Sequence, residues 1–158
     1  MGSEMCIRDR YNGGAVASAS GYIIDGQTTD APILGVLNGI FYNAATTLKP
    51  TFANFYKQPI TPANSEDIDA FVFDNPQQQY VVATDDAVTQ AGFLETYDMN
   101  TSAGSDTTGK SSATLDIGDT SADAASFRLL RSAEDPENDE NAAFRSVVVC
   151  INLIELQS

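Results

Sequence analysis

A turn flanked by two β-rich runs constrains the fold of this chain more than any other feature. Residues 70–84 read AFVFDNPQQQYVVAT, with Asp74, Asn75 and Pro76 at the centre. Proline has no backbone N–H to donate, and Asp and Asn side chains hydrogen-bond their own backbone in turns. The pattern predicts a strand, a turn and a second strand, paired as a hairpin, and it indicates a β-rich fold.

Short β-like segments continue on both sides of this turn, separated by turn residues. They cover residues 21–24, 33–42, 51–56, 68–73, 80–84, 93–97, 113–117, 126–131 and 143–156. Gly35 and Gly39 interrupt the second segment and predict a bulge or a sharp twist there. The last segment is apolar on both faces, which predicts a central strand that is covered on both sides.

This spacing of short strands with little helix predicts an all-β fold. We expect a single domain over residues 11–158, an antiparallel β-sandwich or barrel of jelly-roll type with long polar loops. The longest loop is expected at residues 98–112 (DMNTSAGSDTTGKSS), which hold almost no apolar side chain. At most one short helix is expected, a single turn at residues 85–90 with Asp85 or Asp86 as its N-cap.

The first ten residues, MGSEMCIRDR, differ in character from the rest of the chain. The run from Met5 to Asp9 matches what one reading frame of a common transposase-type sequencing adapter encodes. We therefore interpret residues 1–10 as a library scar and leave them out of the fold argument. On this interpretation the true N-terminus is missing. The alternative is a genuine N-terminus that is short and disordered.

The charge of the chain argues against two classes of partner. The formal net charge is −14, with 22 acidic and eight basic side chains. Beyond residue 10 the basic side chains are scattered, whereas a nucleic-acid surface needs clustered cations. Anionic membranes should repel the chain, and no apolar run approaches the length of a membrane span. We therefore expect neither nucleic acid nor a membrane as a partner.

The residues that carry chemistry form no convincing catalytic set. The chain has no histidine, which removes the usual general base near neutral pH and the commonest transition-metal ligand. Residues 104–112 match the phosphate-loop spacing GxxxxGK[ST], but a polar loop precedes them and a strand-like segment follows, so a solvent-exposed loop is the preferred interpretation. Asp74, Asp85 and Asp86 are explained as turn and capping residues. We expect no catalytic residue, no cofactor and no enzyme activity.

Acidic clusters raise the question of calcium. Carboxylates gather at two places, first Asp116, Asp119 and Asp123, and then Glu134, Asp135, Glu137, Asp139 and Glu140. Neither cluster fits the EF-hand spacing, so solvated acidic loops are preferred to calcium sites and no metal site is predicted. Cys150 lies in an apolar strand pattern, which is typical of a small buried side chain rather than a reactive thiol.

Aromatic side chains cluster in one half of the chain. They are Phe41, Tyr42, Phe52, Phe55, Tyr56, Phe71, Phe73 and Tyr80. Core packing accounts for such a cluster, whereas an exposed subset would indicate an interface, where aromatic residues are enriched.

Two blocks of the chain carry a recognisable set of motifs. The blocks are residues 35–56 (GVLNGIFYNAATTLKPTFANFY) and 67–85 (DIDAFVFDNPQQQYVVATD). The matching positions are Gly35, Val36, Gly39 and Tyr42 in a GVFxGxxY-like segment, Lys49, Pro50, Thr51, Asn54, Phe55 and Tyr56 in a KPTxxNYY-like segment, and Asp74, Asn75 and Pro76 in the turn. These motifs resemble those of a family of small virion proteins of tailed phages, many of them marine, that decorate, cement or stabilise capsids. The chain departs from the family at Val82 and Ala83, where the family often has Val-Gln. The C-terminal half matches in outline, so the resemblance extends over residues 35–156.

The resemblance implies a structural protein without catalysis that binds the outside of a phage capsid and stabilises it. The expected partner is the phage major capsid protein. A homo-oligomer is also expected, with a trimer favoured because it fits capsid three-fold positions. The implied location is the exterior of the virion, after synthesis in the cytoplasm of the host bacterium. The alternative is another phage β binding module, either associated with a tail or fibre or binding carbohydrate.

Two segments are the candidate contacts with the capsid or with other subunits. The first is the aromatic segment with Phe52, Phe55, Tyr56 and Lys57, which has rings to bury. The second is the polar loop from Asn100 to Lys110, which is long enough to reach a partner and has too few apolar side chains to fold alone.

Overall fold

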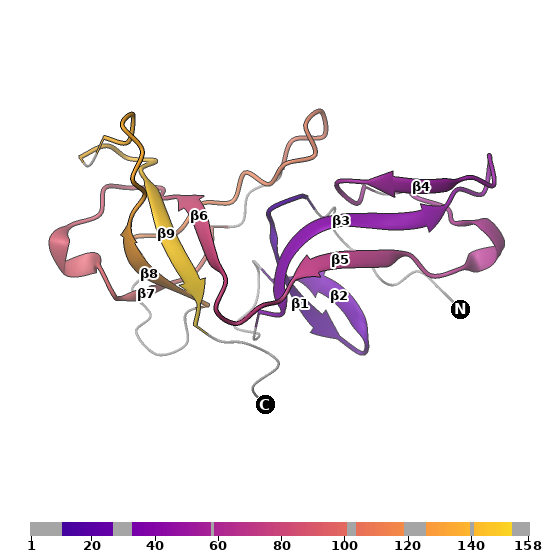
Figure 1. Ribbon diagram of the computed structural model, residues 1–158, viewed down its shortest axis with the longest axis horizontal. Helices are drawn as coiled ribbons and strands as arrows, with labels where there is room; N and C mark the ends of the chain where they lie inside the picture. The colour runs from indigo at the N-terminus through magenta and orange to yellow at the C-terminus, as the bar shows by residue number, and fades with distance from the viewer. Residues whose placement is uncertain are drawn as a thin grey trace.

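The computed structural model describes residues 11–26, 33–57, 59–100, 104–118, 126–139 and 141–152. The segment interpreted as a library scar, residues 1–10, lies outside the described residues. Two antiparallel sheets make up the molecule and lie next to each other along its long axis (Figure 1). The prediction of an all-β fold of antiparallel strands is confirmed, and of its two alternatives, a sandwich or a barrel, the described residues are consistent with a sandwich and form no closed barrel.

The first sheet has five strands and uses the N-terminal half of the described chain. They are β1 (Ala15–Ala19), β2 (Tyr22–Asp25), β3 (Gly35–Asn43), β4 (Pro50–Ala53) and β5 (Asp69–Phe73). β3 is the centre of this sheet, because β1 and β4 pair with successive parts of one edge and β5 pairs with the other. The ladder between β3 and β5 shifts register between Leu37 and Gly39, so the bulge predicted around the glycines of this strand is confirmed.

A two-residue turn joins β1 to β2. Ala19 pairs with Tyr22, and the residues between them, Ser20 and Gly21, have φ angles of 54° and 83°. Two consecutive positive φ angles are typical of the type I′ hairpin turn, whose twist matches that of the flanking strands. β1 was not predicted because its Ala and Ser residues do not favour a strand by themselves, and its strand structure depends on its two partners.

The second sheet has four strands in the order β6-β9-β8-β7. They are β6 (Gln79–Ala83), β7 (Thr96–Tyr97), β8 (Phe127–Ser132) and β9 (Ser146–Ile151). β9 pairs with β6 on one edge and with β8 on the other, and Val147, Val148 and Val149 are buried. The prediction of a central strand near the C-terminus, covered on both sides, is therefore confirmed.

The predicted hairpin of residues 70–84 is wrong, although both of its strands and its turn are present. β5 pairs with β3 in the first sheet, and β6 pairs with β9 in the second, so the turn carries the chain from one sheet to the other. Asn75 makes the turn, since its Oδ1 accepts from the Gln77 N–H at 2.9 Å. The Tyr80 hydroxyl then donates to the Phe73 carbonyl at 2.9 Å, which ties the two strand ends together.

Two other local predictions also need correction. The helical turn expected at residues 85–90 with an aspartate N-cap is a 3-10 turn at Gln90–Gly92, preceded by Thr89. The strand expected at residues 113–117 is reduced to isolated bridges of Leu115 with Thr84 and Met99. The other short helical segment is the 3-10 turn Ala63–Ser65. Within the described residues no helix is long and apolar enough to cross a membrane.

Each sheet has its own group of buried side chains. The larger group lies against the second sheet and includes Tyr97, Leu115, Phe127 and Leu129, joined by Ala15 and Ile33 from the N-terminal half. Burial raises the pKa of the Tyr97 hydroxyl, and Glu95 adds to that effect. The smaller group lies against the first sheet and consists of Val16, Leu37 and Ile40 with partly buried neighbours. The cores meet at β1, whose consecutive residues Ala15 and Val16 belong to different groups.

Candidate functional site

One face of the first sheet carries exposed aromatic rings. Strand residues alternate between the two faces of a sheet. In β5, Asp69, Phe71 and Phe73 are therefore on one face and are exposed, whereas Ala70 and Val72 pack against the smaller core. We call the exposed surface the aromatic face; its rings are Phe41, Phe52, Phe71 and Phe73.

The rings of the aromatic face are exposed to an extent that is unusual for phenylalanine. The exposed fractions are 59% for Phe52, 48% for Phe71 and 52% for Phe73. Phe41 pairs across the ladder with Phe52 and is half-buried. Single exposed apolar residues are ordinary, but a contiguous group on one sheet face marks a place where another molecule binds.

Gly39 gives the aromatic face its shape. The ring of Phe52 lies so close to this residue that an added Cβ atom would be 2.6 Å from Phe52 Cζ. Phe71 pairs with Gly39 from the other side, and the Phe52 and Phe71 ring centroids are 6.0 Å apart. The absence of a side chain on the central strand therefore lets rings from two outer strands meet.

The two predicted contact segments bind each other. Phe55, just after β4, stacks on Tyr11 with ring centroids 5.8 Å apart and planes 7° apart. Lys57 forms an ion pair with Asp106 of the polar loop, and the Tyr11 hydroxyl donates to the other oxygen of the same carboxylate at 2.7 Å. We call this group, Tyr11, Phe55, Lys57 and Asp106, the loop clasp.

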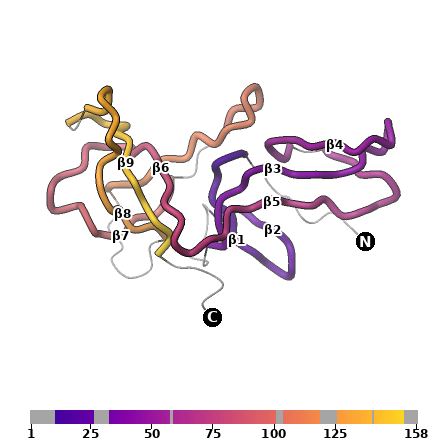
Figure 2. Tube along the Cα trace, in the orientation of Figure 1, coloured from indigo at the N-terminus to yellow at the C-terminus, as the bar shows by residue number. Residues whose placement is uncertain are grey.

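Backbone contacts hold the polar loop at the loop clasp. The Asn12 N–H donates to the Gly109 carbonyl at 2.9 Å, and the Asn54 side chain donates to the Thr108 carbonyl at 3.1 Å. Gly109 has a φ of 68°, and an added Cβ atom would be 2.4 Å from Phe55 Cδ1. This part of the loop stands up beside the end of the first sheet (Figure 2). The described part of the loop is therefore tied to the first sheet, and its contact with a partner stays a prediction.

The charges of the loop clasp shift one pKa. Lys57 and then Tyr11 donate hydrogen bonds to the Asp106 carboxylate, and these bonds hold the pKa of Asp106 below its ordinary value. Both members of the ion pair are about half exposed, so water and salt screen their attraction. The clasp positions the loop, but the charge pair adds little to overall stability.

Two other predicted contact residues, Tyr56 and Asn100, contact other parts of this chain. Tyr56 packs against the smaller core, which includes Val16 and Leu37. The Asn100 side chain donates to Asp85 Oδ2 at 2.6 Å, on the side of the second sheet. Of the predicted contact residues, Phe52 alone belongs to the aromatic face. Phe41, Phe71 and Phe73 were not predicted as contacts, because β5 is apolar on both faces and its pattern does not tell the outer face from the inner one.

The aspartates considered for catalysis or capping have local partners. Asp85 Oδ1 accepts from the Ile117 N–H at 2.9 Å, so its two oxygens fasten two loops. Asp86 Oδ1 accepts from the Ala87 N–H at 2.7 Å. Asp74 lies exposed at the turn between the sheets, where burial and then its negative charge raise the pKa of Tyr80.

The phosphate-loop spacing of residues 104–112 lacks its usual structural setting. No helix follows it in residues 111–118, and Lys110 forms a parallel bridge with Asn12. Within the described residues, no three His, Cys, Asp or Glu side chains come together in a way that could hold a metal ion. Asp119, Asp123 and Glu140 of the acidic clusters lie outside those residues. Cys150 is a free, half-buried thiol in β9.

Comparison of the chain with protein-family models, with curated proteins and with solved structures finds no significant match.

Proposed function

We propose that this protein is a virion structural protein that binds the outside of a phage capsid and stabilises it without catalysis. The observation that carries the proposal is the aromatic face. Aromatic side chains are enriched at protein interfaces, where they bury a large apolar area at a small cost in side-chain entropy. The resemblance of residues 35–56 and 67–85 to capsid decoration proteins supports the same function, and these residues supply β3, β4 and β5 of the first sheet and β6 of the second.

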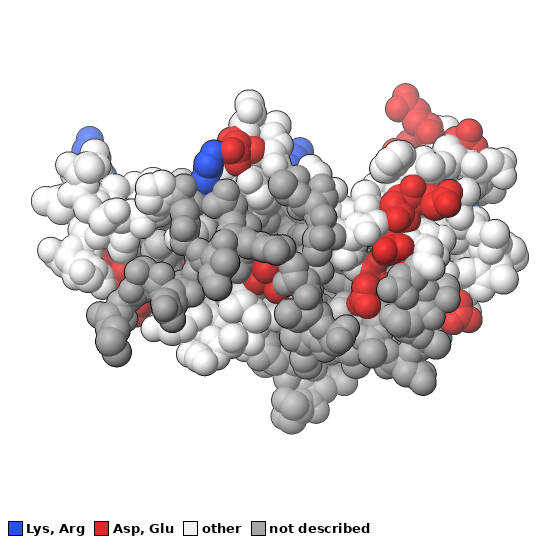
Figure 3. All heavy atoms as spheres, turned by 180° about the vertical axis from the view of Figure 1, so that it is seen from behind, with Lys and Arg blue, Asp and Glu red and all other residues white. Residues whose placement is uncertain are grey.

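The distribution of charge supports one orientation on the capsid. Residues 11–73, which form the first sheet, hold five acidic and two basic side chains, whereas residues 74–158 hold fifteen acidic and four basic ones. On the side of the molecule seen in Figure 3, most of the acidic side chains gather on the half formed by the second sheet. We propose that the less charged first sheet faces the capsid and that the acidic second sheet faces solvent, where its charge keeps particles apart.

The proposed partner is the phage major capsid protein, and a trimer at capsid three-fold positions is the proposed assembly. A subunit that contacts two capsomers through the aromatic face would link them. Capsid stability would then rise because binding favours the assembled shell by mass action.

The experiment uses expanded heads that lack the protein. Purified protein is added, the heads are sedimented, and the bound fraction and the temperature of head disruption are measured. We expect saturable co-sedimentation and a higher disruption temperature. Protein that stays in the supernatant at all concentrations would contradict the proposal.

A second candidate is another phage β binding module, associated with a tail or fibre or binding carbohydrate, and an exposed sheet face with several rings favours carbohydrate binding. Sugar rings stack on aromatic platforms, but they also need hydrogen-bonding groups beside the rings. The rings are all phenylalanine, which offers none, and Asp69 adds a single carboxylate beside Phe41 on the same face, so a protein partner fits it better. Binding to an array of bacterial surface glycans, with no binding to heads, would select the second candidate.

A further inference from the structure

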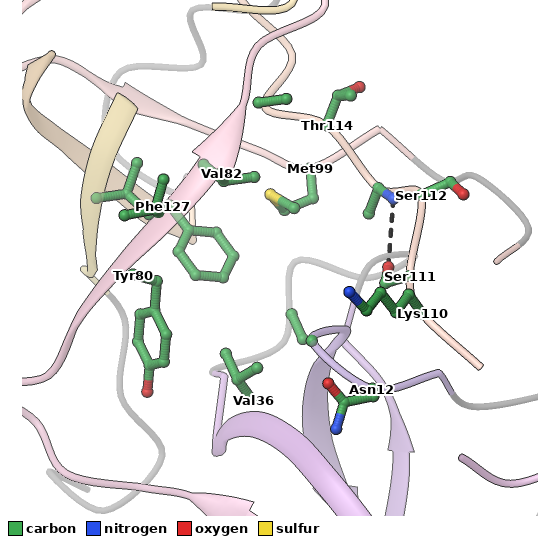
Figure 4. A pocket seen from close by; sticks show the side chains of 16 residues that line it. Asn12, Val36, Tyr80, Val82, Met99, Lys110, Ser111, Ser112, Thr114 and Phe127 are labelled. Atoms are coloured by element: carbon green, nitrogen blue, oxygen red, sulfur yellow. Dashed lines mark hydrogen bonds between the residues drawn. The ribbon is translucent and has the colours of Figure 1, made fainter. Parts of the chain in front are cut away.

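A cavity of about 520 Å³ lies between the two sheets and is separate from the aromatic face. Figure 4 shows Tyr80 and Val82 of β6 on one side, Val36 of β3 on another, and Lys110 to Thr114 of the polar loop along the rim. Met99 and Phe127 also line it, so the interior is largely apolar. The Lys110 side chain points into the opening from the loop (Figure 4).

The edge of β6 in this cavity has backbone groups that point away from the sheet. The Thr84 N–H donates to the Arg145 carbonyl, which makes Ala83 and Ser146 a pair without mutual hydrogen bonds. Since ladder bonding alternates, Val81 and Val148 are also such a pair, and the Val81 N–H and C=O point to the free edge. No described residue outside the ladder bonds these two groups.

A segment of this chain around Leu115 pairs with one end of the β6 edge. The Leu115 N–H donates to the Ala83 carbonyl at 2.9 Å, and the Leu115 carbonyl accepts from the Asp85 N–H at 3.1 Å. Before Leu115, the loop turns away from β6, and the Ser111 N–H donates to the Asn12 carbonyl at 2.9 Å. One end of the β6 edge is therefore occupied by this chain, and no described residue pairs with the Val81 end.

We propose that this cavity binds an extended peptide segment of a partner protein, which adds to the free edge of β6 as a short strand. Unpaired strand groups recognise peptide backbone, and the apolar walls accept side chains at alternate positions of the segment. The occupant is a single short segment, since Leu115 already pairs with the Ala83 end of this edge and leaves only a short length of β6 for a partner. Lys110 at the rim, which forms no ion pair with a described residue, selects a segment with a carboxylate.

The test uses a library of linear seven-residue peptides and the full chain. We expect the selected binders to carry apolar residues at alternate positions and an acidic residue. On binding, we expect slower hydrogen exchange of the Val81 amide. N-methylation of the peptide nitrogens that face β6 should weaken binding about tenfold, the effect of one or two lost hydrogen bonds.

Matched variants separate backbone pairing from simple apolar contact. Val81→Pro removes an N–H that the β6–β9 ladder does not use, so the sheet should still form, and we expect it to bind the selected peptides about tenfold more weakly. Val81→Thr keeps the N–H and should bind normally, and Lys110→Met should remove the preference for an acidic residue. Phe52→Ser, on the aromatic face, should leave peptide binding unchanged even where it abolishes binding to heads.

Three results would overturn the proposal. The first is the absence of any peptide that binds more tightly than about 1 mM, the level at which specific pairing disappears. The second is equal binding of N-methylated and unmodified peptides, which would indicate an apolar ligand without strand pairing. The third is a dimer, detected by sedimentation velocity, that Val81→Pro dissociates, because the occupant would then be a second copy.

Discussion

Phe52 and Phe71 meet over Gly39, with their ring centroids 6.0 Å apart and their planes at 44°. The two rings come from strands on opposite edges of β3, and the central strand brings them together because it offers no side chain at this point. The aromatic face is therefore a continuous surface across three strands. Its rings are held in place by the same ladder that forms the sheet.

Replacing Gly39 should disturb both the sheet and the aromatic face. In Gly39→Ala the new Cβ would be 2.6 Å from Phe52 Cζ and 2.9 Å from the Ala53 carbonyl oxygen. We expect a loss of about 1–3 kcal/mol in the free energy of unfolding, which is typical of overpacking. Urea unfolding measures it. Gly118→Ala is the matched control, because its nearest neighbour would be Asp116 Oδ1 at 3.4 Å. An equal effect of the two substitutions would contradict the proposed geometry.

Two further glycines separate the cost of backbone strain from the cost of a clash. Gly13 and Gly109 both have positive φ angles, but an added Cβ meets nothing within 4 Å at Gly13 and meets Phe55 at Gly109. We expect Gly13→Ala to lower the free energy of unfolding by about 1 kcal/mol, because alanine is strained in the left-handed backbone region. Gly109→Ala should cost about 2–3 kcal/mol, because overpacking adds to that strain. Thermal unfolding at several urea concentrations gives both values, and Gly109→Ala should also speed amide exchange at Asn12.

The loop clasp should respond to pH in one direction. Because the pKa of Asp106 is lowered in the folded protein, the contribution of Asp106 is fully present above its unfolded pKa and is lost as pH falls through the folded pKa. Exchange of the Gly109 amide, which is bonded to Ser105 O, should therefore become faster relative to the intrinsic rate in that acidic range. Asp106→Asn should abolish this pH dependence, and raised salt should weaken the clasp at neutral pH. A clasp that tightens on acidification would refute this assignment.

Asn138 should be the most sensitive position in the loop between β8 and β9. Its side chain donates to Ser132 Oγ and to the Ala133 and Ser146 carbonyls, and its Oδ1 accepts from the Ser146 N–H at 2.9 Å. We expect Asn138→Ala to lower the free energy of unfolding by about 1–3 kcal/mol, because several backbone groups lose their partner. Asn141→Ala, at an exposed position three residues on, is the control and should change it by less than about 0.5 kcal/mol. Similar values for the two variants would show that the Asn138 bonds are unimportant.

The strands were predictable where local chemistry decides the structure. The apolar run of β9 identified a central strand, and Gly39 identified the bulge in β3. The pairing of β5 and β6 was not predictable from the turn at Asn75, because each strand finds a better partner at long range, β3 or β9. The strand β1 was missed because its Ala and Ser residues favour no strand by themselves. The turn Ser20-Gly21 was the available signal for it.

The candidate site could be predicted only in part. Phe52 was expected at a contact surface and lies on the aromatic face, whereas Phe55 and Lys57 are engaged in the loop clasp. Sequence spacing places Phe71 and Phe73 on one face of β5, but it cannot say which face is covered.

The most direct test of the central claim is the affinity of the double variant Phe52→Ser, Phe71→Ser for expanded phage heads that lack the protein. Both rings are about half exposed, so the variant should fold, which circular dichroism can check. Leu48→Ser is the matched control, because Leu48 is a large apolar residue with 70% exposure outside the aromatic face. We predict that the double variant binds heads at least about a hundredfold more weakly than the unmodified protein, the loss of two interface anchors, and that Leu48→Ser binds normally. Equal binding of all three proteins would contradict the claim that the aromatic face is the docking surface.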